Sequence, residues 1–132
     1  FNSQVCTSRS QSERLLALNL KKETADMVWL NHALTEDYDD WRSAPIYMDW
    51  EEWQKDGIPA WSLHRLIEMM PKNIAIDGDT AYPLQIQKRS DGKWCVGYQG
   101  WYDCVGDLYD SVIWIYQLLI SEGYLDEFCN KG

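Results

Sequence analysis

Residues 106–124, GDLYDSVIWIYQLLISEGY, are the most strongly patterned stretch of the sequence and decide its fold class. Asp107 stands where an N-cap side chain accepts a hydrogen bond from the first free amides of a helix. Gly123 stands where a left-handed residue ends one. The apolar residues between them recur at spacings of three and four, which predicts an amphipathic helix at the centre of the core. Its buried stripe would consist of Val112, Ile113, Ile115, Tyr116, Leu119 and Ile120.

The sheet that this helix would cover is predicted from the segment before it. YPLQIQ (82–87) and KWCVGY (93–98) alternate in polarity, which is typical of strands with one buried face. Asp91 and Gly92 lie between them and suit a hairpin turn, so we expect an antiparallel pair. Cys95 would point away from the face that carries Leu84, Ile86, Trp94, Val96 and Tyr98.

Two further helices are predicted closer to the N-terminus. TSRSQSERLLALNL (7–20) begins with hydroxyl caps followed three residues later by an amide or acid, and Asn19 can take the left-handed conformation that ends a helix. IPAWSLHRLIEMMP (58–71) places Ser62 as a cap before apolar residues at helical spacing. The periodicity of Val28–Tyr47 is poor, which predicts a loop with one strand over Pro45–Met48.

These elements predict an α+β fold in which a small antiparallel sheet, built on the central hairpin, is packed by about three helices. The chain has 132 residues with 45% hydrophobic and 25% charged residues, which fits one globular domain over residues 1–132. It contains no apolar run of the roughly twenty residues that a membrane-spanning helix needs. We therefore expect a soluble protein without a membrane partner. The N-terminal residues lack an apolar signal core, so the expected location is the cytoplasm.

Acidic residues are concentrated in Thr35–Gly57, TEDYDDWRSAPIYMDWEEWQKDG. The net charge of the chain is -9, and this stretch holds eight carboxylates against Arg42 and Lys55, or -6. A surface of that sign repels phosphate backbones, which argues against direct nucleic-acid binding and leaves basic proteins, cations or solubility as its purpose. Trp50 and Trp53 are interpreted as core side chains because large aromatic residues are mostly buried.

The first part of the acidic stretch is the candidate binding segment. No periodic pattern carries Trp41 inward, so we consider it a candidate contact at a partner surface. Its neighbours are interpreted as a solvated acidic loop. The candidate partner-binding residues are Asp37, Tyr38, Asp39, Asp40 and Trp41.

The reactive side chains do not form a known catalytic or metal-binding motif. The four cysteines include no close pair of the kind that binds zinc or forms a redox dithiol, so we expect no metal and no cofactor. Two disulfides are arithmetically possible, but without a secretory signal four thiols in a reducing compartment are favoured. Cys95 with His64 could in principle form a nucleophile and base, although no motif links them. The sequence therefore predicts no catalytic residues and no enzymatic activity.

Taken in order, five segments of this chain resemble a recurring pattern of small uncharacterised proteins from gut Bacteroidales and their phages. The resemblance spans about Thr7–Tyr124 and departs from the pattern at Asn19, where members typically have glycine. It implies a cytoplasmic bacterial or phage-related setting and carries over no catalytic residues. The five segments are TSRSQSERLLAL, TADM, IPAWSLHRLIEMMP, the hairpin ending in KWCVGY, and VIWIYQLLISEGY.

The sequence supports one main functional hypothesis and leaves three more open. The main hypothesis is a small acidic, non-enzymatic protein-interaction module whose Trp-bearing loop docks on a basic protein. A narrower variant is an inhibitor that mimics nucleic acid in the cleft of a DNA-binding protein. A small thiol-dependent hydrolase that uses Cys95 and His64 is a third hypothesis. The fourth is a domain whose partner is a second copy of itself.

Overall fold

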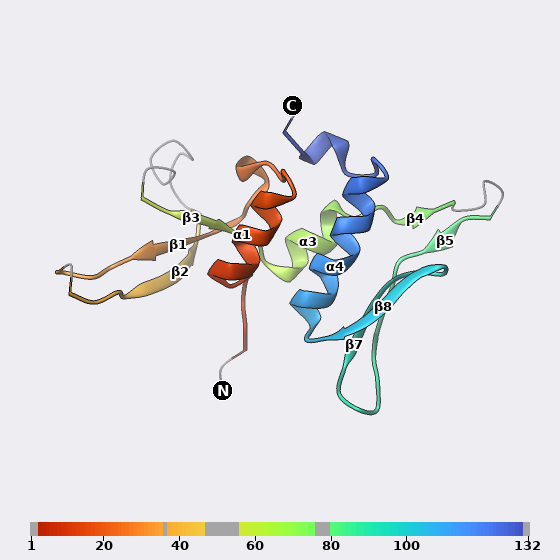
Figure 1. The fold of residues 1–132 in the computed structure, drawn as a ribbon, viewed down its shortest axis with the longest axis horizontal. Coiled ribbons are helices and arrows are strands. Elements are labelled where there is room, and N and C mark those ends of the chain that lie inside the picture. The colour runs from red at the N-terminus through yellow and green to blue at the C-terminus, as the bar shows by residue number, and fades with distance from the viewer. Residues whose placement is uncertain (1–2, 36, 47–55, 76–79, 131–132) are drawn as a thin grey trace. The chain divides into compact units, whose positions relative to one another are not determined.

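The structure is a computed structural model that describes residues 3–35, 37–46, 56–75 and 80–130 (Figure 1). The chain divides into two compact units, Phe1–Leu66 and Ile67–Gly132, and each is described by itself below. The organisation of residues 1–132 as one domain stays a prediction. Trp50 and Trp53, which were interpreted as core side chains, lie outside the described residues.

The first unit begins with helix α1 (Arg9–Ala17), which starts and ends as its sequence predicts. The Ser8 hydroxyl accepts from the Gln11 amide, and the Gln11 side chain accepts from the Ser8 amide, which completes a capping box. Asn19 follows the helix with φ of 76°, the left-handed conformation that asparagine tolerates. Gln11, Ser12 and Leu15 are buried, so one side of α1 belongs to the core.

The sheet of the first unit has the strand order β2-β1-β3 (Figure 1). Strand β1 (Met27–Asn31) pairs antiparallel with both β2 (Trp41–Pro45) and β3 (Ile58–Ala60). A short 3-10 helix, η1 (Lys22–Thr24), precedes β1 in the chain. The prediction of a loop across Val28–Tyr47 is therefore wrong, because this segment contains most of β1 and all of β2.

Trp61 is the centre of the first unit's core, and its side chain is completely buried. Its indole donates to the Thr24 hydroxyl, and its backbone exchanges hydrogen bonds with Thr7. Asp26 accepts from both the amide and the hydroxyl of Ser62. These bonds satisfy polar groups that would otherwise be costly to bury, and they connect residues more than thirty positions apart.

Helix α3 (Leu63–Met69) begins directly after Ser62, whose hydroxyl accepts from the Arg65 amide. The predicted capping role of Ser62 is confirmed. The second unit continues with two short strands, β4 (Asn73–Ile74) and β5 (Tyr82–Pro83), which pair antiparallel.

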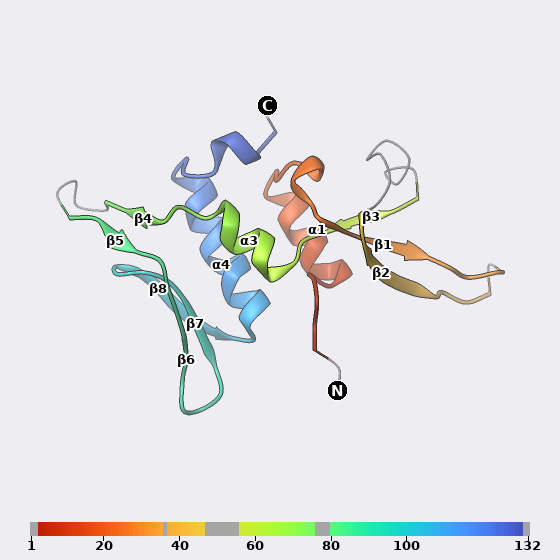
Figure 2. The same ribbon diagram turned by 180° about the vertical axis from the view of Figure 1, so that it is seen from behind.

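The second unit also contains a three-stranded sheet in the order β6-β7-β8, shown from behind in Figure 2. Strands β6 (Gln85–Lys88) and β7 (Trp94–Tyr98) form the predicted hairpin, with Gly92 at φ of 89° in the turn. Strand β8 (Trp101–Gly106) pairs with β7 on its other side. Val96 and Tyr98 are fully buried.

Helix α4 (Leu108–Ser121) follows β8 and packs against β7 and β8. Asp107 caps it by accepting from the Asp110 amide, and Gly123, at φ of 83°, follows its end as predicted. A last 3-10 helix, η2 (Asp126–Phe128), comes near the C-terminus. Ile120 of the apolar stripe predicted for α4 is half-buried. The other predicted members are fully buried: Val112, Ile113, Ile115, Tyr116 and Leu119.

The α+β class and the antiparallel pairing are confirmed, but the single small sheet is not. The described residues form three separate small sheets instead of one sheet around a central hairpin. Three α-helices are present in the described ranges. Across those same ranges, no helix is long and apolar enough to cross a membrane.

The cysteines differ from the prediction of four thiols. Cys95 and Cys104 lie opposite each other in the β7–β8 register and form a disulfide. The side chains of Cys6 and Cys129 are buried. The prediction failed because β8 was not recognised as a strand, so nothing in the sequence analysis brought the two sulfurs together.

Candidate functional site

The candidate site is the connection between β1 and β2 at the tip of the first unit's sheet. The two strands end at the pair Asn31 and Trp41, and residues 32–40, here called the hairpin loop, join them. The His32 amide donates to the Asp40 carbonyl at 2.8 Å, which extends the pairing by one step beyond the strands. All but one residue of this loop is described by the structure.

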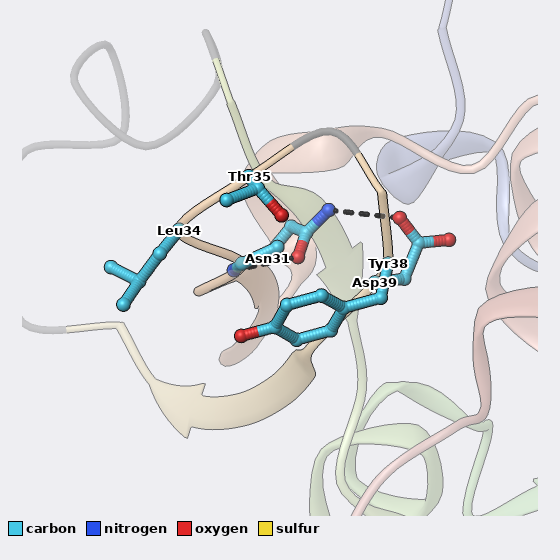
Figure 3. Close-up of a pocket in the computed structure, with 6 residues that line it drawn as sticks. Asn31, Leu34, Thr35, Tyr38 and Asp39 are labelled. Atoms are coloured by element: carbon cyan, nitrogen blue, oxygen red, sulfur yellow. Dashed lines mark hydrogen bonds between the residues drawn. The ribbon is translucent and has the colours of Figure 1, made fainter.

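Asn31 holds the base of the hairpin loop with its side-chain amide. Its Oδ1 accepts from the Ala33 amide at 3.0 Å and from the Asp40 amide at 2.9 Å, so one oxygen bonds to both arms of the loop. Its Nδ2 donates to the Asp39 carboxylate at 3.3 Å (Figure 3). Asparagine suits this position because a single side chain supplies both an acceptor and a donor.

An open pocket of about 470 Å³ lies against the hairpin loop. Figure 3 shows the Tyr38 ring and the Leu34 side chain extending from the loop, with Asn31 and Asp39 joined beside them. Leu34 is 89% exposed and Tyr38 is 55% exposed. An aliphatic and an aromatic side chain therefore stand in water next to a carboxylate. The pocket is lined by Asn31, Ala33, Leu34, Thr35, Tyr38 and Asp39.

Four of the predicted binding residues, Asp37 to Asp40, lie on the hairpin loop, and the fifth, Trp41, begins β2. Tyr38 and Asp39 line the pocket, and Asp37 is exposed beside them. The Asp40 carboxylate is occupied by Arg42, whose guanidinium donates to it from Nη2 at 2.9 Å and from Nε at 3.3 Å. The charge available to a partner on the described part of the loop therefore comes from Asp37 and Asp39.

Trp41 is the first residue of β2 and has a different environment from Asp37, Tyr38 and Asp39. It is half-buried, and the Arg9 guanidinium carbon lies 4.7 Å from its ring centroid. A guanidinium over an indole face is a favourable cation–π pair. The indole Nε1 is buried and has no hydrogen-bond partner among the described residues. Trp41 thus lies at the base of the loop, where β2 begins. Leu34 and Tyr38 form the exposed apolar surface of the loop.

Sequence reasoning missed Asn31 and Leu34. Leu34 is the only aliphatic side chain larger than alanine between His32 and Asp40, which is a signal that could have identified it. Asn31 had no signal of its own, because its role depends on the pairing of β1 with β2.

Cys95 and His64 do not form the nucleophile and base considered from the sequence. Cys95 is 1% exposed and its sulfur is bonded to Cys104, so it is not a thiol in this structure. His64 is exposed on α3. Burial raises the pKa of the Cys6 thiol; a hydrogen bond with Ser43 lowers it by less, and the Asp26 charge adds to the rise. A raised pKa disfavours the reactive thiolate at neutral pH.

No set of three or more His, Cys, Asp or Glu side chains is arranged to hold a metal ion within the part of the chain that the structure describes. Comparison of the chain with protein-family models, with curated proteins and with solved structures finds no match. The inference of a function consequently depends on the geometry and charge of the hairpin loop.

Proposed function

We propose that this protein is a non-enzymatic interaction module that docks onto a basic protein partner through its hairpin loop. The observation that supports the proposal is the exposure of Leu34 and Tyr38 beside the Asp39 carboxylate, around one pocket. Binding hot spots are enriched in tyrosine, and a ring of polar groups around an apolar contact excludes water from it. Tyr38 is the anchor in this proposal, and Asp37 and Asp39 provide the charge.

The loop is also held in shape before it binds. Asn31 fixes both of its arms, and the Arg9–Trp41 contact fixes its base. A preformed loop loses less conformational entropy on binding than a disordered one. The acidic charge would steer a basic partner during encounter, so association should weaken as salt is added.

The resemblance to small proteins of gut Bacteroidales and their phages suggests a setting for this interaction. We propose a cytoplasmic location and a bacterial host protein as the partner. Under the narrower variant, nucleic-acid mimicry, the partner is a DNA-binding protein and DNA competes with the hairpin loop for it. A cell extract of a Bacteroidales species is accordingly the first source of partners to test.

Site-specific crosslinking would test the docking surface. A photoreactive phenylalanine derivative replaces Tyr38 in one variant and Tyr102 in the control, since both side chains are exposed but Tyr102 lies on β8. We expect position 38 to crosslink a discrete basic protein that position 102 does not. The captured protein is then purified and its binding to the unmodified chain is measured by calorimetry.

Charge-matched variants decide whether the loop acts as proposed. Asp37→Asn with Asp39→Asn should weaken binding of the purified partner on the order of tenfold and reduce its salt dependence. The control, Glu13→Gln with Glu23→Gln, removes two exposed carboxylates elsewhere in the first unit and should leave affinity within about twofold. Equal affinities for the two double variants, or a neutral partner without salt dependence, would contradict the proposal.

A further inference from the structure

The disulfide of the second unit joins two residues with unequal access to solvent. Cys95 lies on β7, the middle strand of the β6-β7-β8 sheet, and is 1% exposed. Cys104 lies on β8, at the edge of that sheet, and is partly exposed. The two residues are directly opposite each other, so the S–S bond bridges from the middle strand to the edge strand.

We infer that Cys104 is a thiol-exchange site, at which a small thiol such as glutathione attacks the disulfide and forms a mixed disulfide with this chain. The inference concerns the second unit and is independent of the proposed docking loop. It follows from the way in which thiol–disulfide exchange proceeds and from the unequal exposure of the two cysteines.

The geometry of exchange favours Cys104 over Cys95. An attacking thiolate approaches one sulfur along the S–S axis, from the side opposite the bond that breaks. Cys104 lies on the edge strand β8 and is partly exposed, so a thiolate in solvent can reach it. Cys95 lies on the middle strand between β8 and β6, where Gln87 is its paired residue, and is 1% exposed. A thiolate in solvent therefore has less access to Cys95.

The step balances without any further oxidant. The thiolate of glutathione forms a bond to Cys104 Sγ, and the electron pair of the broken S–S bond leaves on Cys95 Sγ, which takes a proton from solvent. A second glutathione thiolate then attacks the glutathione sulfur, which releases glutathione disulfide and leaves the Cys104 thiolate. Two electrons pass from two glutathione molecules to the protein, and glutathione disulfide reverses both steps.

The first step should also reverse easily within the protein. Cys95 is held opposite Cys104 by the strand register, so its thiol remains beside the mixed disulfide and can displace glutathione again. Since the mixed disulfide is short-lived while Cys95 can attack it, replacing Cys95 by serine should trap glutathione on Cys104.

Single-cysteine variants provide the main test. Cys95→Ser leaves Cys104 as a thiol, and Cys104→Ser leaves Cys95 as a thiol, while buried Cys6 and Cys129 give the same background in both. With glutathione disulfide under native conditions, Cys104 in the first variant should be modified on the order of tenfold faster than Cys95 in the second. Peptide mass spectrometry locates the modification. Equal rates, or faster modification of Cys95, would overturn the inference.

A second measurement on the unaltered chain covers the case in which a variant does not fold. The oxidised protein is exposed to reduced glutathione for short times, quenched with acid and digested. Mixed disulfide found on the Cys104 peptide supports the inference. Mixed disulfide found mainly on the Cys95 peptide, or protein whose four cysteines are all thiols before any reductant is added, contradicts it.

Discussion

Tyr98 connects the stability of the second unit to pH. Its side chain is fully buried and its hydroxyl donates to the Pro71 carbonyl. Burial raises the pKa of Tyr98 above its ordinary value of 10.0, because the phenolate would lose its hydration. The folded state therefore keeps a proton that the unfolded chain has released above pH 10. The stabilising contribution of Tyr98 is complete below that pH and declines as the pH rises beyond it.

We predict that the free energy of unfolding falls by up to about 1.4 kcal/mol per pH unit above pH 10 through this group alone. Tyr98→Phe should cost about 1 kcal/mol at pH 8, where it removes one buried hydrogen bond, and should lose this part of the alkaline dependence. Urea unfolding between pH 8 and pH 11 measures both effects. The exposed Tyr102→Phe variant is the control and should follow the unaltered protein. Parallel pH profiles for the unaltered chain and Tyr98→Phe would show that Tyr98 is not responsible.

Asn31 makes the conformation of the hairpin loop depend on one side chain. Asn31→Ala removes the acceptor shared by the Ala33 and Asp40 amides and the donor to Asp39. We predict that hydrogen exchange at the Ala33 and Asp40 amides becomes on the order of tenfold faster, since about 1 kcal/mol of hydrogen bonding protects them. NMR-detected exchange measures it. Amides in β7 serve as the internal control, and unchanged rates at Ala33 and Asp40 would rule out this role for Asn31.

At the scale of elements, Gly97 allows β8 to lie against β7. A Cβ built on Gly97 would lie 2.1 Å from the Trp101 carbonyl oxygen, and φ is 155°. Gly92 in the hairpin turn also has positive φ, but a Cβ there would meet nothing within 4 Å. We predict that Gly97→Ala destabilises the protein by more than about 3 kcal/mol because backbone must move, whereas Gly92→Ala costs about 1 kcal/mol for its dihedral alone. Urea unfolding compares the two variants, and similar losses would show that the β7–β8 contact is not tight.

Helix boundaries were predictable because their determinants are local. The Ser8–Gln11 capping box, the Asp107 cap and the left-handed Asn19 each act within a few residues of the helix end. Strands β1 and β2 were not predictable in the same way. They are short, and the hairpin loop between them lacks the two-residue Asn-Gly or Asp-Gly turn that identifies a hairpin. Their pairing depends on contacts that the local pattern does not contain.

The disulfide could have been predicted by counting residues outward from the turn that joins β7 and β8. Gln99 and Gly100 form a two-residue connection between Tyr98 and Trp101, and Gly100 has φ of 91°. Three residues outward from each end of that turn, the register places Cys95 opposite Cys104. In contrast, the five predicted binding residues were found from charge and aromatic content, which identify a segment but not which of its side chains reach water. The Arg9–Trp41 contact required the fold.

At the scale of the whole molecule, the acidic hairpin loop and the disulfide belong to different units. The hairpin loop belongs to the first unit, and the Cys95–Cys104 disulfide to the second. Disulfides persist in oxidising compartments and are opened in reducing ones, so the proposed cytoplasmic setting would keep Cys95 and Cys104 exchanging with the thiol pool. Binding through the loop should then be measured in both redox states.

The stability of the whole chain should depend on that redox state. The disulfide closes a loop of sequence separation 9, and the loss of chain entropy in the unfolded state stabilises the folded protein by about 2–3 kcal/mol. We predict that dithiothreitol lowers the urea midpoint of the unaltered protein. The double variant Cys95→Ala with Cys104→Ala should have the midpoint of the reduced protein, whether or not dithiothreitol is present. Tryptophan fluorescence follows the unfolding. The control, Cys6→Ala with Cys129→Ala, removes the other two cysteines and should retain the response to dithiothreitol. If the midpoint of the unaltered protein is the same before and after reduction, closing this loop does not stabilise the fold.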